Sequence, residues 1–289
     1  MSGPDALFSL RNNFYVGAYQ AAINDSDVHG LSEDESIERD CLVYRSYIGL
    51  RSYQLVIDEI NDSAPTPLQA VKILAMYLAG PQYKENAISS LKEWLSDGVI
   101  SNNPVLKLVA GTIYMHEQDY NEALKHTHSG GTLELNALNV QIYLKMHRSD
   151  HAEKQLKIMQ QIDEDHTLTQ LANAWINLAV GGSKVQEAYL IFQDFCDKYQ
   201  QTVTILNGKA ICCMHMGKFD EADTVLLEAL NKDAKDADTL ANLVVCNLHL
   251  GKPVTRYLSQ LKSYHPEHLL IKRASSAEEN FDRSVQAVA

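Results

Sequence analysis

Apolar residues recur along this chain at intervals of three and four residues rather than at every second position. The series Leu68, Val71, Leu74 and Leu78 is one example. Such spacing places the apolar side chains on one face of an α-helix. Because the same spacing returns along most of the chain, the pattern predicts an all-α protein.

The chain is also self-similar at a period of 34 residues. The string MHMGK at 214–218 returns as LHLGK at 248–252. The first copy is followed by FDEA at 219–222, and related strings are DYNEA at 119–123 and KVQEA at 184–188. An aromatic or apolar residue, two polar residues and a small residue are typical of the turn and second helix of a tetratricopeptide repeat (TPR).

The small residue of these strings has a physical reason, because a large side chain would force apart two helices that cross closely. Used as a marker, this position recurs at spacings of 29 to 36 residues. The 29- and 31-residue spacings leave open whether two repeats are short or pair their helices differently. The marker positions are Ala22, Val56, Ala87, Ala123, Ala152, Ala188, Ala222 and, in degenerate form, Arg256.

These repeats predict an all-α fold, a divergent TPR-like α-solenoid whose antiparallel helix pairs form a right-handed superhelix. Residues 1–289 are expected to form one domain of about eight helix-pair units, with a capping helix at 266–289 that shields the last repeat. The sequence leaves open whether one of the short repeats contains a non-helical hairpin. The expected repeat starts are residues 3, 37, 68, 104, 133, 169, 203 and 237.

The charge balance excludes several classes of partner. Lys and Arg number 25 against 37 Asp and Glu, a formal net charge of −12. A protein that binds nucleic acid without sequence preference needs a basic face, so this class is excluded. Autonomous docking on anionic lipid is disfavoured for the same reason. Five cysteines without a Cys-x-x-Cys pair favour a reduced, cytosolic compartment.

Histidines at metal-like spacings are a weak signal for a metal site. His126 and His128 are two residues apart, and His147 and His151 are four apart. The repeat pattern places a turn at 147–150, so the second pair would not share a helical face. We therefore expect surface histidines and no metal ligands.

The cysteines are an equally weak signal for a nucleophile. Cys212 and Cys246 are 34 residues apart, so repeat geometry explains their spacing without redox chemistry. The expectation is a protein without catalytic residues, cofactor or metal, and therefore no enzyme. A metal-dependent or thiol enzyme stays as a distant alternative.

An apolar stripe at one repeat position is the candidate partner-binding surface. In TPR folds this position of the first helix lies toward the concave side, where Met and aromatic residues suit a protein partner. The alternative is that the stripe packs against neighbouring helices as core. The candidate residues, including the histidines that follow the stripe, are Phe14, Ile48, Met115, His116, Leu144, Met214, His215, Leu248 and His249.

One class of TPR protein is disfavoured by the concave positions. TPR co-chaperones hold a C-terminal carboxylate with Lys, Asn and Arg. Here one repeat carries Thr204, Asn207 and Ile211 at those places. Such a set offers no bidentate cationic donor to a carboxylate.

Beyond the repeat spacing, longer strings resemble a known family along the whole chain. The chain resembles the epsilon subunit of coatomer, with a plant-like character. The strings that carry the resemblance are LFSLRNNFY (7–15), GAYQAAIN (17–24), YRSYI (44–48), MHEQDY (115–120), AWINLA (174–179), LNGKA (206–210) and FDR (281–283).

This resemblance implies a function that the repeats alone do not. It implies a non-enzymatic structural subunit of the COPI vesicle coat that encircles and stabilises the C-terminal domain of the coatomer alpha subunit. The resemblance also implies a role in Golgi-to-ER and intra-Golgi transport. It places the protein in the cytoplasm, peripheral on Golgi membranes and COPI vesicles. Membrane contact would be only through the assembled coat, and other coatomer subunits would be indirect partners. The alternative is an unrelated cytosolic TPR adaptor that binds short peptides of exchangeable partners.

Overall fold

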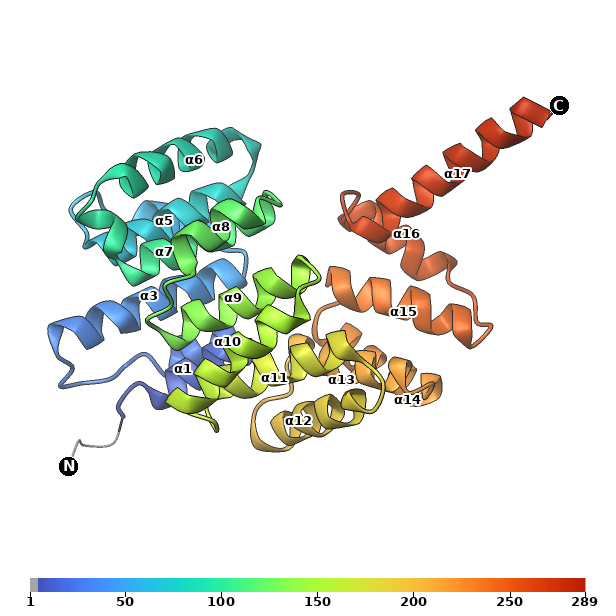
Figure 1. Cartoon of the computed structure of the whole chain (residues 1–289), viewed down its shortest axis with the longest axis horizontal. Coiled ribbons are helices and arrows are strands. Elements are labelled where there is room, and N and C mark those ends of the chain that lie inside the picture. The colour runs from blue at the N-terminus through green and yellow to red at the C-terminus, as the bar shows by residue number, and fades with distance from the viewer. Residues whose placement is uncertain (1–4, 289) are drawn as a thin grey trace. The chain divides into compact units, whose positions relative to one another are not determined.

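A computed structural model describes residues 5–288, and every element of regular structure in that range is a helix (Figure 1). The helices divide into two compact units, Met1–Val180 and Gly181–Ala289. The expected first repeat start at residue 3 and the last residue of the expected cap, 289, lie outside the described residues. That the whole chain acts as one domain stays a prediction.

Unit 1 contains eleven α-helices and one short 3₁₀ helix among its described residues. Consecutive helices form antiparallel pairs, and the first helices of successive pairs contact one another. The helices are α1 (Phe8–Tyr15), α2 (Tyr19–Asn24), α3 (Glu33–Gly49), α4 (Tyr53–Glu59), α5 (Thr66–Ala79), α6 (Pro81–Ser96), η1 (Ile100–Asn102), α7 (Pro104–His116), α8 (Tyr120–Thr127), α9 (Leu133–Lys145), α10 (Ser149–Ile162) and α11 (Thr167–Val180).

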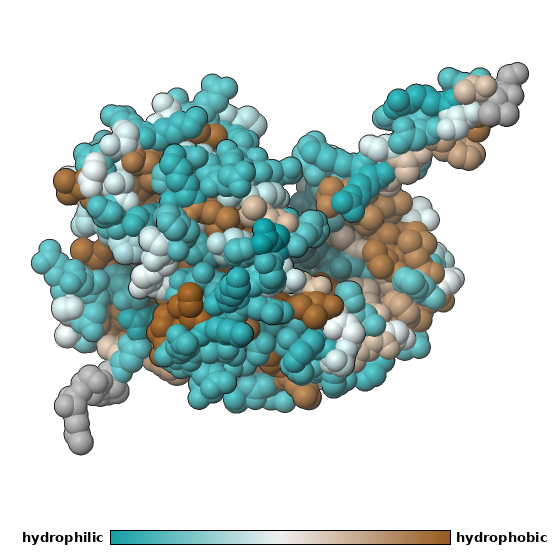
Figure 2. Space-filling model, viewed as in Figure 1, coloured by the Kyte–Doolittle hydropathy of each residue, from teal (hydrophilic) through white to brown (hydrophobic). Residues whose placement is uncertain are grey.

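Unit 2 continues the same pattern. Figure 2 shows apolar surface in the region of α15 on the face in view. The helices are α12 (Lys184–Lys198), α13 (Val203–His215), α14 (Phe219–Lys232), α15 (Ala237–His249), α16 (Thr255–Tyr264) and α17 (Leu269–Val288).

The small marker residues lie where the two helices of a pair cross. All seven small markers are fully buried, whereas the degenerate marker Arg256 is exposed. The 31- and 29-residue spacings follow short second helices, since α4 has 7 residues and α8 has 8, against 14 for α14. The short spacings are therefore short repeats with ordinary pairing, and no strand occurs within residues 5–288.

The turns between paired helices repeat one hydrogen-bond pattern. In the turn of α13, the Gly217 N–H donates to the Met214 carbonyl at 3.0 Å and the Lys218 N–H donates to the Cys213 carbonyl at 2.9 Å. This is the Schellman motif, which needs a residue with positive φ after the helix. The same pair of bonds closes the first helices at Gly17, Arg51, Gln118, His147 and Gly251.

Three of these turns place a non-glycine residue in the left-handed region. Arg51, Gln118 and His147 have φ of 63°, 62° and 58°, and all three are exposed. Replacing each with Gly is expected to raise the free energy of unfolding by about 0.5–1 kcal/mol, because only Gly adopts this conformation without steric cost. Urea unfolding of the single variants and of the triple variant measures the gain.

The control is Gly17→Ala, which introduces a Cβ at φ 82° in an equivalent turn and should lower the unfolding midpoint. If the three Gly variants lower the midpoint, the left-handed turns are not strained in this chain.

Helix α17 only partly matches the expected cap at 266–289. Ile271 in its first turn is buried against Leu240 and Leu261. Beyond that turn the helix is exposed, and Phe281 and Val285 are 69% and 50% exposed. Helix α17 therefore covers the last helix pair only through its first turn.

Candidate partner-binding site

The first helices of unit 1 form a row that returns to its own beginning. Each of α3, α5, α7 and α9 contacts the next first helix, ending at α11, and α1 contacts both α3 and α11. Thr167, the first residue of α11, donates a side-chain hydrogen bond to the Asn12 amide oxygen on α1. The Tyr15 ring lies 5.7 Å from the ring of His166. Residues that are 155 apart in sequence are therefore in contact within one unit.

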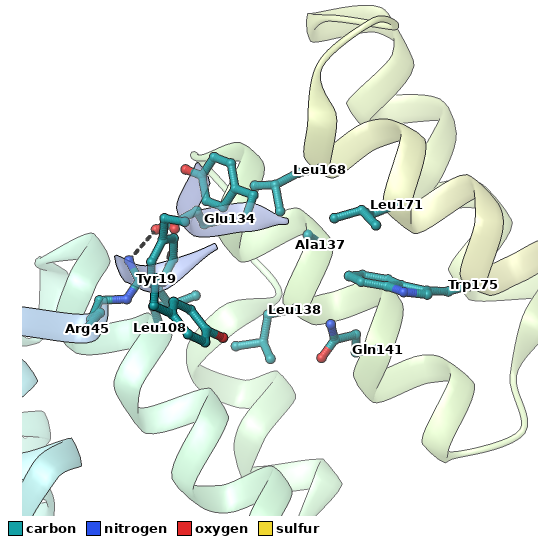
Figure 3. Close-up of a pocket in the computed structure, with 12 residues that line it drawn as sticks. Tyr19, Arg45, Leu108, Glu134, Ala137, Leu138, Gln141, Leu168, Leu171 and Trp175 are labelled. Atoms are coloured by element: carbon teal, nitrogen blue, oxygen red, sulfur yellow. Dashed lines mark hydrogen bonds and ion pairs between the residues drawn. The ribbon is translucent and has the colours of Figure 1, made fainter. Parts of the chain in front are cut away.

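A pocket of about 230 Å³, here called the inner pocket, lies between these helices (Figure 3). Its lining is mainly aromatic and aliphatic, which is the composition expected of a site that binds apolar side chains. One wall comes from α1 and α2, and the opposite wall comes from α9 and α11. The lining residues are Phe14, Tyr15, Tyr19, Arg45, Leu108, Glu134, Ala137, Leu138, Gln141, Leu168, Leu171 and Trp175.

An ion pair between α3 and α9 borders the inner pocket. Arg45 and Glu134 meet through two contacts, Nη1 to Oε2 at 3.1 Å and Nη2 to Oε1 at 3.0 Å. The Arg45 guanidinium also lies 4.6 Å from the centre of the Phe14 ring. Burial lowers the pKa of Arg45, but the adjacent Glu134 carboxylate more than offsets this, so the pKa is raised overall. The guanidinium is therefore held charged and fixed in position.

Polar groups on the opposite wall point into the same pocket. Figure 3 shows the Gln141 amide between Leu138 and the indole of Trp175. Both Gln141 and Trp175 are only half-buried. A Gln amide can donate to and accept from a peptide group, and an indole offers one N–H donor beside a large apolar face. The inner pocket can therefore hold an apolar side chain while pairing with the backbone that carries it.

The structure distributes the candidate stripe residues of unit 1 among different environments. Phe14 lines the inner pocket. Ile48 is buried in the core, and Met115 packs half-buried against the same core cluster. Leu144 packs against a second cluster, and the exposed His116 makes an edge contact with the Tyr77 ring at 6.1 Å. Only Phe14 of this set belongs to the pocket.

The stripe residues of unit 2 are more accessible. Leu248 is 61% exposed and Met214 is half-buried. His215 and His249 are exposed, and the His249 ring stacks on Phe219 at 4.3 Å. The expected partner-binding role of these residues stays a prediction.

The sequence pattern missed most of the inner pocket. Leu108 and Gln141 occupy repeat positions that lie on the concave side of TPR folds, so repeat register could have found them. Tyr19 and Trp175 lie at other positions. They reach the pocket because α1 and α2 approach α9 and α11, and this approach depends on the curvature of the whole unit.

The residues considered for chemistry have structural environments. The Nε2 atom of His126 lies 3.2 Å from Glu122, and His151 stacks on Tyr143 at 5.2 Å. Among the described residues, no three His, Cys, Asp or Glu side chains are grouped so that they could hold a metal ion.

The cysteines are also poor nucleophiles. All five are buried and free. Burial raises the pKa of Cys41 and Cys212 to about 12 and that of Cys213 to about 11. These thiols therefore stay protonated at neutral pH.

Within residues 5–288, no helix is both long enough and apolar enough to cross a membrane.

Comparison with known proteins identifies relatives along the whole chain. Residues 3–289 match the family model of the coatomer epsilon subunit. The chain is 71% identical to coatomer subunit epsilon-1 of Arabidopsis thaliana, covering 100% of this chain and 99% of that protein. It is 73% identical to coatomer subunit epsilon-1 of Oryza sativa subsp. japonica, with 100% of both chains covered.

Solved structures share the fold at low sequence identity. A tetratricopeptide repeat protein from Parabacteroides merdae superposes with a TM-score of 0.61 at 13% identity, over 93% of this chain and 96% of that one. The APC/C hetero-tetramer Cut9-Hcn1 gives a TM-score of 0.61 at 13% identity, over 93% of this chain and 54% of that one. These matches confirm the predicted TPR-like α-solenoid.

Proposed function

The chain belongs to the coatomer epsilon subunit family, and on this premise we propose that it binds the C-terminal domain of the coatomer alpha subunit and stabilises that subunit within the COPI coat. The role is structural, without catalysis or cofactor. It supports Golgi-to-ER retrograde and intra-Golgi vesicle transport. The protein acts on the cytoplasmic side, peripheral on Golgi membranes and COPI vesicles, and reaches the membrane only through the assembled coat.

The inner pocket of unit 1 carries this proposal. Its aromatic and aliphatic lining suits a dedicated protein partner, because apolar and aromatic anchors dominate stable interfaces. Its volume of about 230 Å³ suits anchoring side chains rather than a large cofactor. An extended segment of the alpha subunit would place an apolar side chain against Trp175 and its backbone against Gln141.

The candidate stripe extends the proposed contact. Leu248, Met214 and the neighbouring histidines are accessible on unit 2. They would supply apolar and aromatic area to the same partner. Ile48 would contribute indirectly, by shaping the core behind the surface.

Co-expression with the C-terminal domain of coatomer alpha tests the proposal. We expect a stoichiometric 1:1 complex by size exclusion with light scattering, and the complex should survive high salt because an apolar interface is not screened. Replacement of Trp175 with Ala should weaken binding by about 30-fold or more, since truncation of a central Trp anchor costs about 2 kcal/mol.

Trp94 is the matched control, because it is the other of the chain's two tryptophans, is also half-buried, and lies on α6 outside the inner pocket. Trp94→Ala should leave the affinity within about threefold. Separate elution of the two unaltered proteins would refute alpha binding. Equal losses for both Trp variants would remove the inner pocket from the interface.

A further inference from the structure

The contact between α1 and α11 differs from every other helix contact described in unit 1. The other contacting helices of unit 1 are neighbours along the chain or first helices of successive pairs. In repeat arrays, stability is approximately a sum over such neighbours. A contact between the two ends of the row therefore adds a separate contribution to the stability of the unit. It can break while every interface between neighbouring helices stays intact.

This end-to-end contact is small. It includes the Thr167 to Asn12 hydrogen bond and the tilted contact of the Tyr15 and His166 rings. Tyr15 also packs on the apolar cluster that includes residues of α9 and α11. One hydrogen bond, one ring contact and the packing of one Tyr side chain stabilise far less than the burial of a whole helix face. The contact is therefore among the first that thermal motion opens.

The inner pocket has walls on both sides of this contact. Phe14 and Tyr19 belong to the α1–α2 side, and Leu171 and Trp175 belong to the α11 side. Opening the contact separates the two walls. A segment seated between them contacts both walls and favours the closed form, by the linkage between binding and conformation.

We infer that the contact formed by Asn12, Tyr15, His166 and Thr167 is a clasp, which opens in the free chain to admit an extended segment of the partner and then closes on it. The identity of the partner rests on the proposed function, but the opening of the clasp does not. The two can therefore be tested separately.

The free chain tests the opening by thiol labelling. Ala137→Cys places a thiol at a buried position of the inner pocket, 4% exposed with the clasp closed. In this background, Thr167→Val removes the hydroxyl that binds Asn12 and should speed labelling of the new thiol about fivefold, the factor that corresponds to the loss of one hydrogen bond. The native Cys212 and Cys213, both fully buried in unit 2, report unfolding and should label at an unchanged rate.

Thr127→Val is the matched control. The Thr127 hydroxyl also binds an asparagine, Asn139, but joins the neighbouring helices α8 and α9. This variant should leave labelling at position 137 within about twofold. Equal acceleration by both Thr variants, or none by Thr167→Val, overturns the clasp.

Locking the clasp tests admission of the partner. In Asn12→Cys/Thr167→Cys, a short bifunctional thiol reagent joins the two ends of the row. The chain locked before mixing should lose binding to the alpha domain, whereas the complex locked after mixing should dissociate at least tenfold more slowly than the unlocked one. Binding by the pre-locked chain at the unlocked rate refutes gating. Failure of the unlocked chain to bind refutes the alpha assignment and leaves the labelling result to decide the clasp.

Discussion

Replacing Arg45 with Ala is expected to lower the free energy of unfolding by about 3 kcal/mol, one of the largest effects of any single polar substitution in the chain. Only 15% of the Arg45 side chain and 22% of the Glu134 side chain are exposed. Removal of one member of such a buried pair leaves the other charge without compensation, and this loss dominates the cost. Urea unfolding of the full chain, followed by circular dichroism, measures the change in the free energy of unfolding.

The surroundings of Arg45 add to this expectation. A second cavity, of about 330 Å³, adjoins the inner pocket, and Tyr15, Arg45 and Glu134 line both. The pair therefore separates two spaces that a small side chain would join. A shortened side chain also withdraws the cation from the Phe14 ring.

Two further variants separate the charge from the contact. The double variant Arg45→Met/Glu134→Leu should regain most of the lost stability, because an apolar pair of similar volume leaves no unpaired charge. Arg148→Ala breaks a pair whose side chains are 51% and 56% exposed, and it should cost far less stability than Arg45→Ala because solvent screens the pair. If Arg45→Ala costs no more than Arg148→Ala, the pair is effectively solvated and does not support the inner pocket.

The repeat architecture could be predicted because it depends on residues that are close together in the sequence. The small residue of each pair must be small wherever two helices cross, so spacing alone located Ala123 and Ala152 at crossings in the core. The Schellman turns were recognisable where a glycine marks them, as at Gly217. At Gln118 and His147 the same turn carries no glycine, so composition gave no signal there.

The closure of the inner pocket could not be predicted because it depends on geometry that accumulates over several repeats. Whether α1 reaches α11 depends on small rotations added over five helix pairs, and no local spacing records that sum. Asn12 and Thr167 are ordinary polar residues in sequence, and only the fold makes them partners. The stripe rule found Phe14 because concave positions were counted, and it missed Trp175 because that residue lies at another position of its repeat.

The capping role expected at 266–289 depends on packing that the sequence pattern does not record. The one-sided polar pattern of this segment predicts a helix, and α17 lies there, but the pattern does not say what covers the apolar side. The first turn packs through Ile271, while Phe281 stays exposed. A helix of 20 residues is longer than the last helix pair can cover, since α15 has 13 and α16 has 10.

In unit 2, Gly208→Ala is expected to destabilise by about 1–2 kcal/mol, although Ala normally stabilises a helix interior by up to about 1 kcal/mol relative to Gly. A Cβ atom at position 208 would lie 2.4 Å from two ring carbons of Phe192, and Phe192 is 2% exposed. A ring buried to this extent has little space to move. Urea unfolding of the full chain, followed by circular dichroism, should therefore show a lower midpoint for Gly208→Ala.

The sign of this effect should reverse when the ring is removed. In a Phe192→Leu background, the two ring atoms nearest the new Cβ, Cε1 and Cζ, are gone, and Gly208→Ala should then stabilise by about 0.5–1 kcal/mol through helix propensity. The coupling between the two positions should therefore be about 2 kcal/mol, well above the additivity of independent sites. Stabilisation by Gly208→Ala in both backgrounds would show that the Phe192 ring yields easily and that close approach of α12 and α13 does not require glycine at this position.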